Sequence, residues 1–193
     1  MDQEGLTQVK ERFDRLSLCA HVLSSSTATL AERESAWLDF LQYHGTIYSK
    51  LEQASKATSA AKKWFDVKKT ERKSDELLAY LHHARNVGEH TIRAASTKAV
   101  FAVSGSIQSE GGFLGISFDE NGKPFASSNL ADVKVHENEV LLLSAKDRGV
   151  DYKPPVTHMG HAVEASTARE VALIALPHVE KLIQEAQAFD PPK

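Results

Sequence analysis

The spacing of apolar residues changes twice along the chain, and this change limits the folds that it can adopt. Up to about residue 95, and again after residue 166, apolar residues recur every three or four positions, as in an amphipathic helix. Over residues 97–155, β-branched and aromatic runs alternate with turn signals, which is typical of strands. This order predicts an α+β fold, a helical bundle with a small antiparallel β-sheet inserted before the last helix. We expect one domain over residues 1–193, with the bundle formed by 6–95 and 166–189 and the β-rich insertion by 97–155.

Five helices are expected from the apolar spacing and from the residues that cap helix ends. Thr29 with Glu32, and Thr167 with Glu170, have the spacing of a capping box, in which each side chain accepts a hydrogen bond from the other residue's backbone N–H. Pro177 lies inside the last helix and is expected to kink or split it. The expected helices cover residues 6–23, 29–55, 58–69, 74–95 and 167–189, the third being either a short helix or the frayed end of the second.

Strands are expected where the helical period stops. Asn121-Gly122 stands between two apolar runs and predicts a hairpin turn, because both residues adopt positive φ readily. Lys153-Pro154-Pro155 is expected to end the β-rich region, since proline cannot donate to a strand ladder. The expected strands cover residues 100–103, 113–118, 123–127, 133–136 and 140–144, the last two lying on either side of Glu137-Asn138-Glu139.

Composition and charge exclude several classes of function. The formal net charge is -3, so no global positive field attracts nucleic acid or membrane, and an RNA contact would need a local patch. The single cysteine, Cys19, allows no internal disulfide. No apolar run approaches the roughly 18 residues of a membrane helix, and the acidic N-terminus lacks a signal-peptide core, so we expect a cytoplasmic protein. The glycines at 105, 111, 112 and 115 lack the spacing of a phosphate-binding loop, so no nucleotide cofactor is expected.

The helix expected over residues 74–95 has two contrasting faces. At about 100° per residue, one side is almost wholly apolar or small and should face the core, with Gly88 among its members. The opposite side spans about 160° and is rich in histidine and asparagine, which are poor helix formers for a merely solvated surface. Its members are Arg85, Glu89, His82, Arg93, Asn86, His90 and His83. The alternative is an ordinary salt-bridge ladder of Arg85, Glu89 and Arg93 at four-residue steps.

Arg85-Asn86-Val87-Gly88-Glu89-His90 fits the pattern Arg-Asn-x-x-x-His and resembles the motif of the HEPN superfamily, whose members are helical bundles. The resemblance covers the motif and the helical residues but not the 97–155 segment. It implies a metal-independent endoribonuclease or RNA-binding protein without a cofactor. Arg85, Asn86 and His90 would be catalytic, and His82, Arg93 and His44 would contact the substrate. A histidine can move the proton of a ribose 2′-OH, and an arginine can hold the phosphate. Because one chain supplies one motif, we expect a homodimer.

Two other functions remain open from the sequence. The first is a non-enzymatic interaction or ligand-binding protein built on the same bundle. The second is a metal-dependent hydrolase, for which His158 and His161 are the candidate ligands, although a three-residue spacing in a loop is weakly specific. Residues 62–69 mix lysines with Trp64 and Phe65, which fits either a nucleic-acid-binding segment or an amphipathic helix with its lysines outside.

Overall fold

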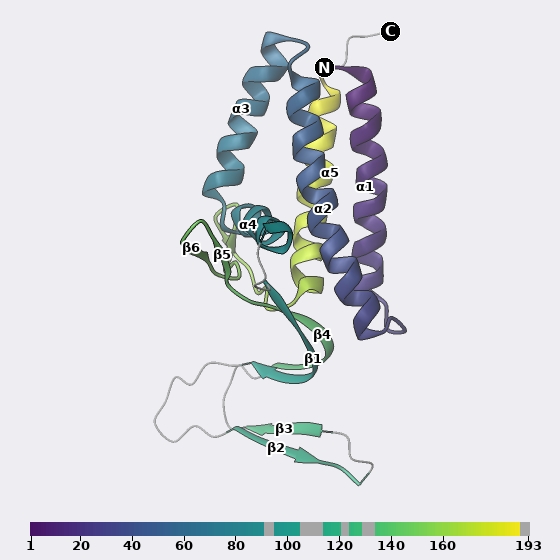
Figure 1. Cartoon of the computed structure of the whole chain (residues 1–193), viewed down its shortest axis with the longest axis vertical. Coiled ribbons are helices and arrows are strands. Elements are labelled where there is room, and N and C mark those ends of the chain that lie inside the picture. Colours follow the sequence, from purple (N-terminus) through teal and green to yellow (C-terminus); the bar gives the residue numbers. More distant parts are fainter. Residues whose placement is uncertain (91–94, 105–113, 121–123, 129–133, 190–193) are drawn as a thin grey trace.

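The computed structural model describes residues 1–90, 95–104, 114–120, 124–128 and 134–189. They form the expected α+β fold, a helical bundle with small antiparallel ribbons at one end (Figure 1). The helices are α1 (Gln3–Ser24), α2 (Leu30–Ser55), α3 (Ser59–Ser74), α4 (Glu76–His90) and α5 (Ala168–Gln187). Among the described helices, none is long and apolar enough to cross a membrane.

Three long helices, α1, α2 and α5, lie along the long axis of the molecule, with α3 beside them and α4 crossing below α3 (Figure 1). Both predicted capping boxes are confirmed, at Thr29 with Glu32 and at Thr167 with Glu170. The core lies between these helices, and its largest fully buried side chains include Trp37, Tyr48 and Tyr80.

Within the described residues, the strands form four two-stranded antiparallel ladders rather than the single sheet that the sequence predicted. β1 (Ser96–Ser104) pairs with β4 (Lys134–Leu142), and β2 (Leu114–Phe118) pairs with β3 (Pro124–Ser128). β5 (Ala145–Asp147) pairs with β6 (Val150–Tyr152), and β7 (Thr157–His158) with β8 (His161–Ala162). The β2–β3 ribbon lies farthest from the helices in Figure 1, whereas β5, β6 and β7 contact α4.

Several boundaries differ from the sequence prediction. β4 is one strand where two were expected, because Asn138 adopts a φ of 53° within it instead of forming a turn. The hairpins β5–β6 and β7–β8 were not predicted, and β7–β8 lies beyond the two prolines. Ala95 lies outside α4, directly before β1, so the helix does not extend to that residue. The turn expected at residues 121–122 lies outside the described residues.

Pro177 does not split α5, which runs from Ala168 to Gln187. A proline leaves the carbonyl four residues earlier without its helical donor. That residue is Leu173, which is exposed, so water can hydrate its carbonyl. Of the two expected effects of Pro177, the split is wrong because the helix is continuous, and the kink stays a prediction.

Buried charges attach β4 to the helices. The carboxylate of Glu139 lies 3.4 Å from Arg33 Nη1 of α2 and 3.0 Å from Arg169 Nε of α5. Glu139 and Arg33 are both buried. Next to this ion pair, the N–H of Leu142 donates to the carbonyl of Ser166 at 3.0 Å. These contacts hold the end of β4 against the bundle. The chain then continues into β5, which lies beside α4.

Candidate functional site

The described part of the polar face of α4, within residues 82–86, packs partly against its own chain. Its apolar face carries Leu77, Tyr80, Leu81, Ala84 and Val87, which are buried as predicted. On the other side, His82, His83, Arg85 and Asn86 are each only partly exposed. α2 and the β5–β6 hairpin supply the groups that cover this face.

Arg85 lies across α2 at a glycine. Its Nε donates to Oε1 of Gln42 at 3.1 Å. A Cβ placed on Gly45 would come within 2.5 Å of Arg85 Cδ, so the arginine occupies the space that any side chain at Gly45 would need. The expectation that Gly88 faces the core is wrong: Gly88 is exposed, and a Cβ there meets no described atom within 4 Å.

A hydrogen-bonded unit joins α4 to the β5–β6 hairpin. Nδ1 of His83 donates to Oδ2 of Asp147 at 2.7 Å, and Nδ2 of Asn86 donates to the same oxygen at 3.0 Å. These two hydrogen bonds lower the pKa of Asp147 below its usual value, so the carboxylate stays ionised and can only accept. The proton of a neutral His83 therefore lies on Nδ1, and Nε2 keeps its lone pair.

The His83 ring is also fixed by an aromatic neighbour. It stacks on Tyr152 of β6 with the ring centroids 3.6 Å apart and the planes 11° from parallel. Neither Asp147 nor Tyr152 could be identified from the sequence, because both lie far along the chain from His83 in a hairpin that periodicity did not reveal. His83 lies on the expected polar face, but the sequence indicates no catalytic or substrate-binding role for it.

His82 and His44 lie deeper than His83. Burial lowers the pKa of His82 to about 4, with further lowering by the charges of Arg72, His83 and Arg85. His44 is 1 % exposed, and burial followed by the charge of Arg72 lowers its pKa to about 3. Both rings are therefore neutral near pH 7. His44 contacts the Tyr48 ring rather than solvent. The function proposed below therefore does not use His44 to bind the substrate.

Two expected site residues lie outside the described side chains. His90 is the last residue of α4, and its side chain is not described. Arg93 lies in the segment 91–94, outside the described residues. The alternative interpretation of this face, a salt-bridge ladder of Arg85, Glu89 and Arg93, depends on residues whose side chains are not described. It therefore stays a prediction.

His158 and His161 pair across the β7–β8 hairpin. Nδ1 of His158 donates to Oδ1 of Asp75 at 3.0 Å, at the N-terminus of α4. Among the described residues, no group of three or more histidine, cysteine or acidic side chains is arranged to hold a metal ion. The structure thus gives His158 a structural partner at the start of α4.

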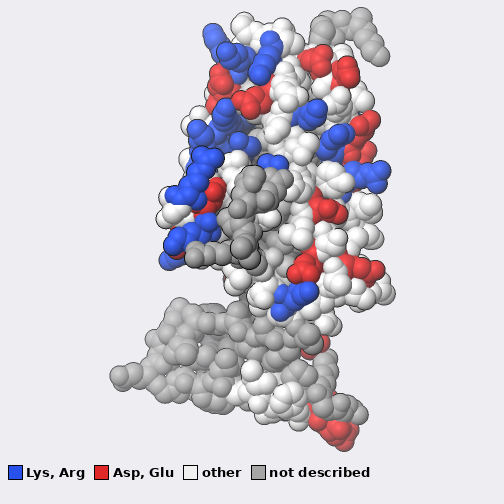
Figure 2. All heavy atoms as spheres, viewed as in Figure 1, with Lys and Arg blue, Asp and Glu red and all other residues white. Residues whose placement is uncertain are grey.

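Basic side chains gather on α3, along the left side of the view in Figure 2. This helix carries six basic residues against two acidic ones. Its aromatic residues face inward: Phe65 is buried, and Trp64 packs on Phe189 while its Nε1 donates to Glu185 at 3.1 Å. The interpretation of an amphipathic helix with lysines outside is confirmed, and Trp64 and Phe65 are not arranged to stack on bases.

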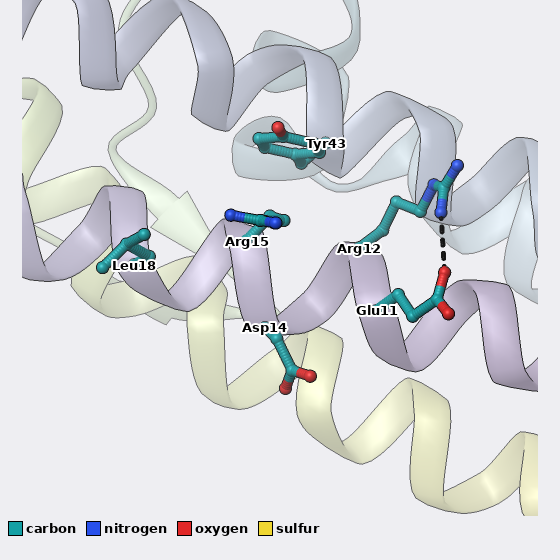
Figure 3. Close-up of a pocket in the computed structure, with 6 residues that line it drawn as sticks. All are labelled: Glu11, Arg12, Asp14, Arg15, Leu18 and Tyr43. Carbon is teal, nitrogen blue, oxygen red and sulfur yellow. Dashed lines mark hydrogen bonds and ion pairs between the residues drawn. The ribbon is translucent and has the colours of Figure 1, made fainter.

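A separate cavity of about 770 Å³ lies between α1 and α2 (Figure 3). Arg15 lies close to Tyr43 in this view, whereas Asp14 points away from that ring and Arg12 pairs with Glu11 at 3.2 Å. None of its lining residues is a histidine, so it lacks the acid–base group found on α4. We therefore take the polar face of α4 as the candidate site.

No family model, no curated protein and no solved structure matches this chain.

Proposed function

We propose that this protein binds single-stranded RNA and cleaves it without a metal ion at the polar face of α4. The observation that carries the proposal is the unit of His83, Asn86 and Asp147, in which an ionised carboxylate holds one nitrogen of a histidine and leaves the other available. Such a pair is a general base in a fixed orientation. The HEPN-like pattern of Arg85, Asn86 and His90 lies on the same helix and supports the same chemistry.

Each residue has a defined part in the proposed reaction. Nε2 of His83 takes the proton from the ribose 2′-OH, and the 2′-oxygen attacks the adjacent phosphorus. Arg85 adds positive charge on the same helix face, which favours the phosphate and the charge that develops on it. The 5′-oxygen leaves with a proton, for which His90 is the proposed donor because His82 is neutral near pH 7. The products are a 2′,3′-cyclic phosphate and a 5′-hydroxyl end.

The basic surface of α3 is the proposed track for the RNA backbone. Lys62, Lys63 and Lys73 are exposed on this helix, and α3 contacts α4 directly. Phosphate contacts of this kind make binding fall steeply as salt rises. The aromatic side chains of α3 are packed inward, so affinity should depend on charge more than on base identity.

The test is cleavage of a labelled single-stranded RNA in EDTA by the wild type and by matched variants. Asp147→Asn and His83→Gln should each slow cleavage by at least about 100-fold, the usual contribution of a positioned acid–base group. His90→Ala should also abolish it. Asp151→Asn, on the exposed part of the same hairpin, and His21→Gln, an exposed histidine of α1, are the controls. A 2′-O-methyl copy of the RNA should resist cleavage.

Equal cleavage rates for the wild type, Asp147→Asn and His83→Gln would show that cleavage does not take place at the α4 face. Loss of activity on adding EDTA would instead favour the metal-dependent hydrolase. Binding is measured separately by fluorescence anisotropy, since Asp147→Asn should slow cleavage while leaving RNA affinity within about twofold.

The active form is proposed to be a homodimer. The pair of His83 and Asp147 is complete within one chain, so a second copy would add another Arg85, Asn86 and His90 rather than complete that pair. Light scattering should show a dimer that Arg85→Glu weakens if the α4 faces meet.

An exposed apolar ribbon favours a second candidate, a binding protein without catalysis. Ile116 and Phe118 lie on one face of β2 and are 54 % and 69 % exposed, and Phe125 of β3 is 48 % exposed. Neighbouring exposed apolar side chains such as Ile116 and Phe118 make this ribbon a candidate interaction surface. Under this candidate, Phe118→Ser would disrupt the dimer while Arg85→Glu would not, and no variant would cleave RNA.

A further inference from the structure

We infer that Arg72 of α3 extends the polar face of α4 and, together with His82, forms a binding site for a phosphate group. Arg72 lies near the end of α3, with its guanidinium carbon 4.6 Å from the centre of the Tyr48 ring of α2. α4, which carries His82, crosses below α3 (Figure 1). The inference rests on the proposed RNA function only for the source of the phosphate, which is either a nucleic acid or a free ion.

The guanidinium group of Arg72 is partly buried without a partner for its charge. It forms no hydrogen bond or ion pair with any described residue, and its Nε is buried. Its two terminal nitrogens are not among the buried unpartnered atoms of the described residues, so they are open to solvent. A guanidinium group that is drawn partly out of water loses hydration, which bonds to an anion can replace. An oxyanion on the terminal nitrogens would supply two parallel acceptors.

The carboxylates nearest to Arg72 bind lysines instead. Glu52 raises the pKa of Arg72, against the larger lowering by burial, but its Oε1 lies 2.7 Å from Nζ of Lys69. Glu71, next to Arg72 in the sequence, lies 3.1 Å from Nζ of Lys68. No described carboxylate therefore binds the guanidinium group, and its positive charge is left to attract an anion.

His82 supplies an uncharged donor beside this charge. Burial lowers the pKa of His82 to about 4, and the charge of Arg72 is the next largest cause. The ring is thus neutral near pH 7, with one N–H to donate, and it makes no hydrogen bond with the described part of the chain. The charge of Arg85 also lowers the pKa of Arg72 and of His82, so the potential here is positive. Three donors from two helices can meet three oxygens, which a phosphate offers and a carboxylate does not.

The probe is inorganic phosphate, titrated at constant pH and ionic strength into the full-length ¹⁵N-labelled protein. The Nε–Hε signal of Arg72 and the ring nitrogens of His82 should shift together and saturate. Acetate should bind about fivefold more weakly, because it has one acceptor oxygen fewer for the His82 N–H. Phosphate shifts that never saturate would overturn the inference.

Two variants of Arg72 and one matched control test the site. Arg72→Gln should weaken phosphate binding by about tenfold, since it removes the charge and the paired donors. Arg72→Lys keeps the charge without the planar fork and should weaken binding by about threefold, which also provides a test if Arg72→Gln does not fold. Arg12→Gln should bind as the wild type does, because Arg12 is already paired with Glu11 at 3.2 Å. Wild-type affinity in every folded Arg72 variant, or an equal loss in Arg12→Gln, would overturn the inference.

Single-stranded RNA distinguishes the two sources of the phosphate. If RNA supplies it, Arg72→Gln should reduce the slope of the logarithm of the binding constant against that of salt concentration by about 0.7, the value for one phosphate on a single strand. An unchanged slope, with inorganic phosphate binding lost in the variant, would identify a site for free phosphate.

Cleavage in EDTA separates this inference from the proposed function. A protein that binds phosphate through Arg72 but cleaves no RNA would reject the proposed function and retain the phosphate site. Conversely, RNA cleavage by a protein whose phosphate shifts are the same in Arg72→Gln and in the wild type would retain the function and overturn the site.

Discussion

Gly45 allows the side chain of Arg85 to lie directly on α2, and this one contact decides where the guanidinium group sits. The atoms that a Cβ at Gly45 would meet all belong to the flexible Arg85 side chain, at 2.5 Å from Cδ and 2.9 Å from Nε. Alanine at this position would therefore displace the arginine rather than the backbone. Gly88, on α4 itself, faces open space.

These two glycines give a matched test of Arg85. Alanine in a helix is favoured over glycine by up to about 1 kcal/mol, so neither Gly45→Ala nor Gly88→Ala should lower stability substantially. Gly45→Ala should nevertheless slow RNA cleavage by at least about tenfold, because it breaks the contact of Arg85 with Gln42. Gly88→Ala should cleave as the wild type does. Urea unfolding and EDTA-resistant cleavage measure the two effects, and equal activity of both variants would show that the position of Arg85 is unimportant.

At the scale of elements, the helices were predictable and the small hairpins were not. Each helix carries its own signal in the chain, such as Thr29 with Glu32, so local residues are enough to locate it. The missed turns, Arg148-Gly149 and Met159-Gly160, have positive φ at both positions, but arginine and methionine are uncommon there and gave no turn signal. The candidate site was predictable only on the α4 side. Asp147 could not be placed, since its contact with His83 depends on how the hairpin folds back.

Asp75 joins two elements, and this role gives a prediction about stability. Its carboxylate caps α4 by accepting from the N–H of Leu78 at 3.0 Å, and it also binds Met159 and His158 of the hairpin. Burial raises the pKa of Asp75, but these hydrogen bonds outweigh it and lower the pKa below its usual value. Asp75→Ala should reduce the free energy of unfolding by about 2–3 kcal/mol, because a helix cap and the anchor of the hairpin are lost together.

Asp66→Ala, on the exposed side of α3, is the control for that experiment and should change stability by no more than about 0.5 kcal/mol. Urea unfolding followed by circular dichroism measures both variants. If Asp75→Ala proved as stable as Asp66→Ala, the hairpin would not depend on α4 for its position.

Across the whole molecule, three helices each carry a neutral, partly or fully buried histidine, and two of these rings lie near a cation of a fourth helix. His44 of α2, His82 of α4 and His178 of α5 are all partly or fully buried, and Arg72 of α3 lies over the Tyr48 ring at 4.6 Å. Burial is the largest cause that lowers the pKa of each of these histidines, to about 3, 4 and 4 respectively. The charge of Arg72 further lowers the pKa of His44 and His82. The packing of the bundle therefore requires these rings to stay unprotonated.

This requirement makes the stability of the whole fold depend on pH. Above about pH 6.5, the histidines are neutral in both the folded and unfolded chain, so they contribute no pH dependence. Below that pH the unfolded chain binds protons that the folded chain excludes, and the free energy of unfolding should fall by about 1 kcal/mol per pH unit for each histidine. The fall should be clear between pH 6.5 and 4.5, where the hydrogen-bonded carboxylates of Asp75 and Asp147, whose pKa values are lowered, are still ionised.

Urea unfolding at several pH values tests this prediction, with His44→Leu and the exposed His21→Ala as a matched pair. His44→Leu should remove about one third of the pH dependence, because one of three excluded protons no longer matters. His21→Ala should leave the slope unchanged, since that side chain is exposed on α1. If the free energy of unfolding stayed constant from pH 6.5 to 4.5, these histidines would accept protons in the folded protein without disturbing the bundle. Their burial would then not require them to stay neutral.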